Sequence, residues 1–425
     1  MPLSGDRATD RFKVDLAWNY ASLVILGASG ITLNVMIGLF YDSETLGVFN
    51  QVVAAYIFFS MLASGGINFS ILRSIAERAG DRDACAAVLL GAVVPTVVLS
   101  AIMTTAFWFS ADTVAGWLQS PAVAQGMRMV SAGLFFFAIN KVLISAVNGL
   151  RHMRAFAVFQ ALRWLLVLCG LLIAVALSVP GPWLAGVFTF GETTLFVLLV
   201  IEVSRQLPWW KQRGWLPWIS RHLAFGVKSV LSGVLLELNS RVDILMLGYF
   251  LDDAKVGVYS YAALFAEGFF QVLVVLKNNY NPILARHIAD RRLEELRQLI
   301  RTGRNRIYVA LFVAGVFAIL VYPLLLDLLT NKPEFRLSET PFSILVAGIV
   351  LAAGYLPFQN LLSMANFPAW HSLLISLVVL FNIVANASLI PVWGINGAAV
   401  ATAAAFVVSG FLLRTMAGRL VGLKI

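Results

Sequence analysis

The stretch from Leu223 to Leu251 reads LAFGVKSVLSGVLLELNSRVDILMLGYFL and decides the fold, because it is long and apolar yet carries charges. A helix of this length extends for about 43 Å, more than the ~30 Å of hydrocarbon in a bilayer. Its charged residues are Lys228, Glu237, Arg241 and Asp243. A charge in hydrocarbon costs on the order of a few kcal/mol, so such residues normally face a bundle interior or a wet cavity. Glu237 and Arg241 share one helix face, and Asn239 and Asp243 share the roughly opposite one, which predicts a central helix with protein or water on both sides.

The composition of the whole chain is that of a polytopic membrane protein. Of its 425 residues, 60% are hydrophobic and only 12% are charged, whereas soluble domains carry about 25% charged residues. No polar segment reaches the ~50 residues of a minimal soluble domain. The net charge of +9 suggests a nucleic-acid partner at first. The basic excess lies in loops between apolar runs, however, so we expect no nucleic acid.

Apolar runs near the length of a bilayer span recur twelve times along the chain. They are predicted at 16–41, 48–72, 84–109, 126–149, 155–178, 183–204, 223–250, 256–280, 307–330, 341–365, 370–391 and 394–416. Most of the 31 Lys and Arg residues fall in the segments on the same side as the N-terminus. The segments on the other side hold only Arg128, Lys255, Lys332 and Arg336. The positive-inside rule therefore predicts that both termini are cytoplasmic.

The two halves of the chain carry an internal repeat. Residues 36–49, with Met36, Gly38, Phe40, Asp42 and Gly47-Val48-Phe49, recur at 246–259 as Met246, Gly248, Phe250, Asp252 and Gly257-Val258-Tyr259. Arg73 to Arg78 is echoed by Arg286 to Arg291, and Leu143, Ser145 and Asn148 are echoed by Leu361, Ser363 and Asn366. We interpret these matches as a duplication, although chance similarity between apolar segments is the alternative.

Six spans in each half make the two repeats parallel, because both begin in the cytoplasm. We expect an all-α fold of twelve transmembrane helices in two six-helix lobes around a central cavity. The predicted boundaries are 1–204 for the N-terminal lobe, 205–222 for a cytoplasmic linker and 223–425 for the C-terminal lobe. Such a pair of lobes suits alternating access by rocking around a cleft.

Charged residues inside the spans predict a cationic cavity. The candidates for binding a pyrophosphate and its glycan are Lys141, Arg163, Lys228, Arg241 and Asn239. Lys supplies a point charge and Arg a two-pronged fork, and both suit phosphate. Asp243, Glu237 and Glu267 are candidates for coupling to H⁺ or Na⁺. In the alternative interpretation, Glu237 and Arg241 form only an intrahelical pair, and Asp243 is satisfied by a neighbouring helix.

Other polar residues inside spans leave their roles open. Arg163 lies near the cytoplasmic edge, so a cavity role and a structural role are equally supported. For Glu192 and Glu267, ion coupling and a buried hydrogen bond are equally supported. Amides such as Asn140, Gln359 and Asn386 suit sugar hydroxyls, but amides also hold membrane helices together.

Nothing in the sequence indicates an enzyme. His152, His222, His287 and His371 show no metal-ligand spacing, and there is no phosphate-binding loop of the Walker type. The loops on the outer side are short, which disfavours a lipid-linked sugar polymerase or ligase. We therefore expect no catalytic residues, no metal and no cofactor.

Two cytoplasmic segments have a distinctive composition. Residues 205–218 join the halves and mix four Trp residues with basic ones, which suits an interfacial segment on anionic headgroups or a plain linker. Residues 289–306 are basic, with Leu293, Leu296 and Leu299 at helical spacing. This second pattern predicts an amphipathic surface helix.

Several motifs together carry a family resemblance. They are Gly38…Asp42…Gly47-Val48-Phe49, Gly65-Gly66…Leu72-Arg73, Gly149-Leu150-Arg151-His152-Met153, Asn239-Ser240-Arg241-Val242-Asp243 before Gly248…Gly257-Val258-Tyr259, and Gly394-Ile395-Asn396-Gly397. With these, the whole chain resembles the Wzx-type polysaccharide or O-antigen flippases of the multidrug/oligosaccharidyl-lipid/polysaccharide exporter superfamily. Twelve spans fit that branch, whereas the similar peptidoglycan-precursor flippases usually carry fourteen.

The resemblance implies a flippase of the bacterial inner membrane. Its substrate would be an undecaprenyl-pyrophosphate-linked oligosaccharide, such as an O-antigen or exopolysaccharide repeat unit. Its partners would be membrane lipids and possible glycan polymerase and chain-length proteins. Three alternatives stay open: a drug/cation antiporter of the same superfamily, a membrane-embedded glycan polymerase or acyltransferase, and a scaffold that transports nothing.

Overall fold

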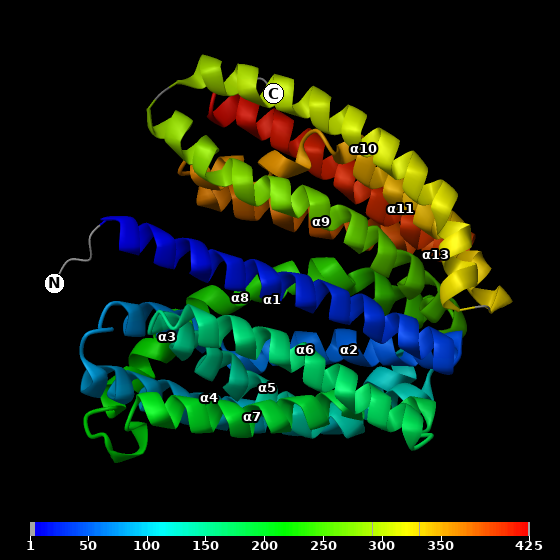
Figure 1. The fold of residues 1–425 in the computed structure, drawn as a ribbon. Helices are drawn as coiled ribbons and strands as arrows, with labels where there is room; N and C mark the ends of the chain where they lie inside the picture. The colour runs from blue at the N-terminus through cyan, green and yellow to red at the C-terminus, as the bar shows by residue number, and fades with distance from the viewer. Residues whose placement is uncertain (1–4, 291, 331, 424–425) are drawn as a thin grey trace. The chain divides into compact units, whose positions relative to one another are not determined.

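The computed structural model describes residues 5–290, 292–330 and 332–423, and within them it leaves out the side chains of 5–17, 19, 20, 23, 211 and 231–240. All regular structure among these residues is helical, which confirms the all-α prediction (Figure 1). The first seven α-helices are α1 (Gly5–Phe40), α2 (Ser43–Ser64), α3 (Ile67–Ala76), α4 (Arg82–Trp117), α5 (Pro121–Gly149), α6 (Met153–Ala176) and α7 (Gly186–Gln206). The others are α8 (Leu216–Phe250), α9 (Asp253–Ala289), α10 (Leu293–Leu329), α11 (Glu339–Ala352), α12 (Leu361–Met364) and α13 (Pro368–Leu420). Four short 3-10 helices are η1 (Gly181–Trp183), η2 (Trp209–Lys211), η3 (Pro333–Ser338) and η4 (Leu356–Phe358).

Nine helical segments within the described part of the chain are long and apolar enough to cross a bilayer. The predicted spans 16–41 and 223–250 fall in α1 and α8, which contain the stretches whose side chains are left out. The predicted spans 370–391 and 394–416 both fall in α13, which kinks at Gly394 with φ 57° and ψ −134°. The total of twelve spans and the cytoplasmic termini stay predictions.

Two runs that were predicted as single spans are broken. The run 48–72 is divided between α2 and α3, because Gly65 (φ 52°) and Gly66 (φ 68°) take up the left-handed backbone that glycine adopts without strain. The run 341–365 is divided into α11, η4 and α12 around Pro357, which lacks the N–H needed to continue a helix.

The chain forms two compact units. Unit 1 contains Met1–Met36 and Gln51–Glu237, and unit 2 contains Ile37–Asn50 and Leu238–Ile425. The borders between them lie inside α1, α2 and α8, so each of these helices contributes to both units. The lobes 1–204 and 223–425, with their linker, stay a prediction.

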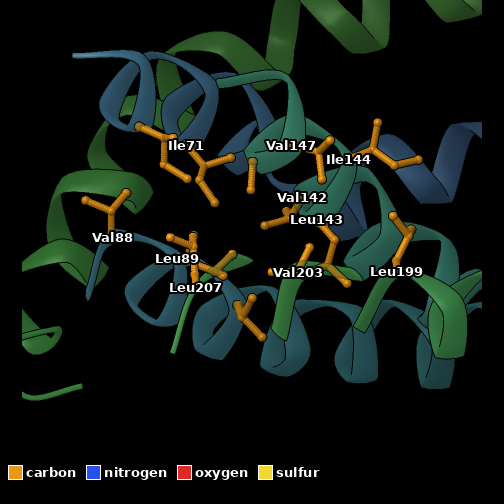
Figure 2. Close-up of a cluster of buried hydrophobic side chains, with 14 of the residues drawn as sticks. Ile71, Val88, Leu89, Val142, Leu143, Ile144, Val147, Leu199, Val203 and Leu207 are labelled. Carbon is orange, nitrogen blue, oxygen red and sulfur yellow. The ribbon is translucent and has the colours of Figure 1, made fainter. Parts of the chain in front are cut away.

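The core of unit 1 is an aliphatic cluster between α3, α4, α5 and α7 (Figure 2). Ile71, Leu89, Leu143 and Leu199 are each at most 1% exposed. The chain that follows α7 also joins this cluster, since Leu207 is 1% exposed and Trp209 packs against it. This packing fixes α5 and α7 next to one another, and these two helices carry much of the site described below.

The core of unit 2 includes the segment that was predicted as a surface helix. Residues 293–306 form the start of the long helix α10, with Leu296 and Ile300 fully buried against α9, α12 and α13. Leu293 and Leu299 are partly buried against the same cluster, whereas Arg301 is exposed. The helix is therefore amphipathic as predicted, but its apolar face packs on protein.

The repeated motifs fold alike. Asp42 Oδ1 accepts a hydrogen bond from Thr45 N at 2.8 Å, and Asp252 Oδ1 accepts one from Lys255 N at 2.9 Å. Each Asp therefore caps the helix that follows it, α2 or α9. Within unit 2 the two copies cross at Gly47 and Gly257, where a Cβ on either residue would lie 1.8 Å from a backbone oxygen of the other helix. Only glycine permits so close an approach.

Farther along the chain, the structure pairs the repeats in a different register from the sequence match. Arg151 (φ 58°) follows α5 and Asn366 (φ 67°) follows α12, and each takes the left-handed turn before the next helix. Arg151 N donates to Asn148 O at 2.9 Å, as Asn366 N does to Ser363 O at 3.2 Å. Asn366 is thus the counterpart of Arg151, whereas the sequence echo had matched it with Asn148.

Candidate functional site

A buried ionic cluster lies in unit 1, where α5, α6 and α7 meet. Arg163 on α6 and Glu192 on α7 form an ion pair with 2.9 Å between Nε and Oε1. The side chains are 13% and 1% exposed, respectively, so the pair is almost entirely removed from solvent. A buried ion pair is stable only when each charge keeps its partner and its remaining polar atoms are bonded.

Asn140 on α5 completes the surroundings of that carboxylate. Its Nδ2 donates to Glu192 Oε2 at 2.8 Å and to the Glu192 carbonyl oxygen at 2.9 Å. Asn140 is fully buried. The sequence left open whether this amide serves sugar hydroxyls or helix packing, and the structure uses it to hold α5 to α7.

The ring of Phe137 brings two of the predicted cations together. The Arg163 Cζ atom lies 4.7 Å and the Lys141 Nζ atom 5.2 Å from its centroid. Both distances are within the ~6 Å of a cation–π contact. Lys141 Nζ also lies 3.3 Å from Met61 Sδ on α2. Two cations thus share one aromatic ring, and one of them, Arg163, also pairs with Glu192.

Unit 2 holds its own carboxylate, the half-buried Asp243 on α8. Tyr259 OH on α9 donates to Asp243 Oδ2 at 2.7 Å, and Ile244 N donates to Asp243 Oδ1 at 2.9 Å. Tyr259 is fully buried. Arg241 lies two residues before Asp243 on α8. It is half-buried and interacts with Asp243 electrostatically.

The remaining predicted site residues fall into two groups. Lys228 in unit 1 and Glu267 in unit 2 are both exposed. Glu237 and Asn239 lie among the side chains outside the described part of the chain. Lys141 and Arg163 therefore come together in unit 1, as do Arg241 and Asp243 in unit 2. The convergence of all the predicted cations on one cavity stays a prediction.

The sequence reasoning missed Phe137 and the role of Tyr259. Phe137 precedes Lys141 by four positions, which is the helical spacing that places two side chains on one face. Tyr259 belonged to the repeated Gly-Val-aromatic motif, in which Phe49 of the first copy has no hydroxyl group. That difference between the copies was the available signal for a polar contact in the second one.

Groups of three or more His, Cys, Asp or Glu side chains that are able to hold a metal do not occur among the described residues. The cluster in unit 1 consists of two cations, one carboxylate, one amide and one aromatic ring.

Two family models match the chain. The one described as polysaccharide biosynthesis protein matches residues 24–286, which is more than half of the sequence. The chain belongs to the polysaccharide biosynthesis protein family. The second model, described as MatE, matches residues 229–388. The resemblance drawn from the motifs is thereby confirmed at the level of the family. No curated protein matches the sequence significantly.

Solved structures of similar fold are transporters. A multidrug resistance MATE family transporter of the MOP superfamily, solved in an inward-facing conformation, has a TM-score of 0.72 at 15% identity, with 95% of each chain covered. The lipid II flippase MurJ has a TM-score of 0.66 at 12% identity, covering 91% of this chain and 87% of its own. A MOP superfamily transporter from Pyrococcus furiosus, described as having a binding pocket of reverse polarity, has a TM-score of 0.58 at 14% identity, covering 97% and 96%. At these identities the likeness shows a shared fold, and with the apolar helices it makes this chain a multi-pass membrane protein.

Proposed function

We propose that this polysaccharide biosynthesis family protein is a flippase of the bacterial inner membrane. Its cargo would be an undecaprenyl-pyrophosphate-linked oligosaccharide, such as an O-antigen or exopolysaccharide repeat unit, moved to the outer leaflet by alternating access. The observation that carries the proposal is the family match over residues 24–286. A fold shared with a lipid II flippase, which by its name moves a lipid, supports it.

The chemistry of the cluster in unit 1 fits a phosphate-bearing headgroup. Lys141 and Arg163 approach one ring from α5 and α6, and Glu192 pairs with Arg163. A low dielectric strengthens the attraction between a cationic side chain and an anion. In this proposal Lys141 contacts the pyrophosphate, and Arg163 supports the ring and the carboxylate beside it. The proposal also assigns Arg241, Lys228 and Asn239 to binding of the cargo.

Coupling of the transport cycle to H⁺ or Na⁺ belongs to the same proposal. Asp243 is its strongest candidate, because it is a carboxylate held by a phenol and a backbone amide. Glu237 and Glu267 are the other candidates. Glycan polymerase and chain-length proteins are possible partners on the side where the cargo is released.

The proposal is tested by reconstituting the full chain in proteoliposomes with a lipid-linked oligosaccharide in the inner leaflet. Periodate or a lectin added outside then reports how much glycan has crossed, and mass spectrometry shows that its mass is unchanged. Lys141→Gln and Arg241→Ala should each lower the crossing rate at least tenfold, a loss of about 1.4 kcal/mol of cargo binding or more. Lys255→Gln, which alters an exposed lysine paired with Asp252, is the control and should keep the wild-type rate.

A drug/cation antiporter is the second candidate, and the MatE match over residues 229–388 favours it. Such a protein would bind a cationic drug, and two cationic side chains beside Phe137 disfavour a cation there. Uptake of a cationic dye by the same proteoliposomes, without movement of the glycan, would replace the flippase proposal by this one. A change in the mass of the glycan would instead indicate a polymerase or acyltransferase.

A further inference from the structure

Two arginines meet one tryptophan where α3 ends and α8 begins, at the predicted cytoplasmic end of unit 1. The Cζ atoms of Arg78 and Arg221 each lie 4.7 Å from the ring centroid of Trp218. The two guanidinium carbons are therefore no farther apart than twice that distance. Arg78 comes just after α3, whereas Trp218 and Arg221 lie in the first turns of α8. Both guanidinium groups are within the range of a cation–π contact with this one indole ring.

The tryptophan is held in place by buried contacts below it. His222 is fully buried, with Nδ1 2.8 Å from Ser70 Oγ and Nε2 3.2 Å from the Val88 carbonyl oxygen. Gly91 on α4 packs so closely that a Cβ there would lie 2.4 Å from the Cβ of Trp218. The start of α8 is thus fixed to α3 and α4, and the ring with its two arginines forms a preformed surface.

The charge of this surface is positive. Glu77 contacts Arg73 at 2.9 Å and Arg78 at 3.2 Å, and those hydrogen bonds lower its pKa, so it is ionised at neutral pH. Arg73 and Arg78 therefore share one carboxylate, and Arg221 adds a further positive charge beside Trp218. Arg221 makes no ion pair with a described side chain. The nearby carboxylates are engaged otherwise: Asp81 caps α4 through Ala84 N, and Asp83 accepts from Gln212 at 2.7 Å.

We infer that Arg78, Trp218 and Arg221 bind the headgroup phosphate of an anionic phospholipid of the phosphatidylglycerol class. A guanidinium group binds two phosphate oxygens at once, and Trp side chains are enriched at the level of the headgroups. The exposed side chains of Trp210 (55%) and Leu216 (65%) flank the cluster on the same segment and suit contact with the lipid. An anionic leaflet attracts each nearby Arg by about 1 kcal/mol, which corresponds to a roughly fivefold preference. This site is separate from the cargo-binding residues and does not depend on the proposed transport function.

The experiment measures which lipid touches Trp218 in the full chain. Nanodiscs of phosphatidylcholine receive increasing fractions of brominated phosphatidylglycerol or brominated phosphatidylcholine, and the contribution of Trp218 is the fluorescence difference from Trp218→Phe. Brominated phosphatidylglycerol should quench Trp218 at a lower lipid fraction than brominated phosphatidylcholine does. Arg221→Gln should raise the fraction of phosphatidylglycerol needed about fivefold. Arg221→Lys should raise it less, because it keeps the charge without the planar fork.

The control is Arg205→Gln, which removes another exposed arginine near the same end of unit 1 and should leave the quenching curve unchanged. Equal quenching by the two lipids, or a wild-type curve for Arg221→Gln, would overturn the inference. An equal shift for Arg205→Gln would also overturn it, since attraction would then come from the overall charge. High salt should weaken the preference in the wild type, because the attraction is electrostatic.

Discussion

Units 1 and 2 each hold a carboxylate among helices, buried Glu192 and half-buried Asp243, but they satisfy it differently. In unit 1 Glu192 faces a full countercharge, the guanidinium of Arg163 at 2.9 Å, together with the amide of Asn140. In unit 2 Asp243 is held by neutral donors, the Tyr259 hydroxyl at 2.7 Å and a backbone N–H. The first arrangement depends on one ion pair, whereas the second depends on several weaker bonds.

In the interpretation of the two halves as a duplication, the positions of the two charged residues are aliphatic in the other copy. In the register that pairs Arg151 with Asn366, Arg163 corresponds to Val378, which is 8% exposed. In the register that pairs Asp42 with Asp252, Asp243 corresponds to Leu33, which is 2% exposed. An aliphatic side chain thus fills each equivalent place in the other unit. Since a buried ion pair often stabilises no more than apolar residues of similar size, the comparison favours a functional role for the charges.

The largest effect is expected at the ion pair of unit 1. Arg163→Met leaves Glu192 buried without its countercharge, and we expect a loss of about 3–5 kcal/mol in the free energy of unfolding. Unfolding in SDS, followed by circular dichroism, measures this loss. The double variant Arg163→Met with Glu192→Leu imitates the apolar counterpart and should recover most of the stability. A double variant as unstable as the single one would break the comparison.

A smaller loss is expected at the carboxylate of unit 2. Tyr259→Phe removes the hydroxyl that donates to Asp243, and a hydrogen bond to a charged group contributes about 1.5–3 kcal/mol. The same unfolding assay measures it. Tyr249→Phe, at a tyrosine that is 55% exposed, is the matched control and should change stability little. A loss for Tyr259→Phe as large as that for Arg163→Met would remove the distinction between the units.

The two units can also be compared at glycines where two helices, or a helix and a turn, lie in close contact. Gly47→Ala in unit 2 places a methyl group 1.8 Å from the Asp253 carbonyl oxygen, and Gly226→Ala in unit 1 places one 2.1 Å from that of Gly65. Such overpacking costs about 1–3 kcal/mol, with the greater loss expected at Gly47. Gly30→Ala, where no atom lies within 4 Å, is the control and should be neutral or slightly stabilising. Equal stability of Gly47→Ala and Gly30→Ala would contradict the close crossing.

The smallest effect is expected in the dependence of the stability of unit 1 on pH. Burial lowers the pKa of His222, which precedes the predicted span 223–250, to about 4 from its ordinary value of 6.5. The unfolded chain therefore takes up this proton first, so the stability is complete above pH ~6.5 and is lost as the pH falls towards 4. Between pH 7.5 and 5.5 the loss should be about 1 kcal/mol. This change of stability with pH should vanish in His222→Gln. An unchanged pH dependence in that variant would show that other groups cause it.

The sequence was sufficient for the parts of the fold that depend on local pattern. Long apolar runs predicted membrane helices. The repeated motif contained Asp42 and Asp252, and in the structure each of them caps the helix that follows it. Composition and motifs together also led to the family. The sequence contained Gly65-Gly66 but did not predict that the helix ends there, because glycine is also tolerated inside membrane helices.

For the candidate site, the sequence named the residue types but not their partners. Lys141, Arg163 and Glu192 were each recognisable as charges in apolar runs. That Glu192 neutralises Arg163, while Phe137 lies against both cations, follows from the packing of α5, α6 and α7. Hydropathy along the chain cannot tell which of several buried charges are neighbours, because every span admits many rotations about its axis.

By itself, then, the amino-acid sequence determined a helical, multi-pass chain with a repeated motif and basic residues in its loops and spans. These properties follow from the chemistry of each segment taken alone, since hydrocarbon demands apolar side chains and internally bonded backbone. Tertiary structure alone decided that Arg163 pairs with Glu192, that Tyr259 bonds Asp243 and that Gly47 meets Gly257. The physical reason is that these contacts join residues from different helices, and only close packing selects one set of neighbours among the many that the pattern allows.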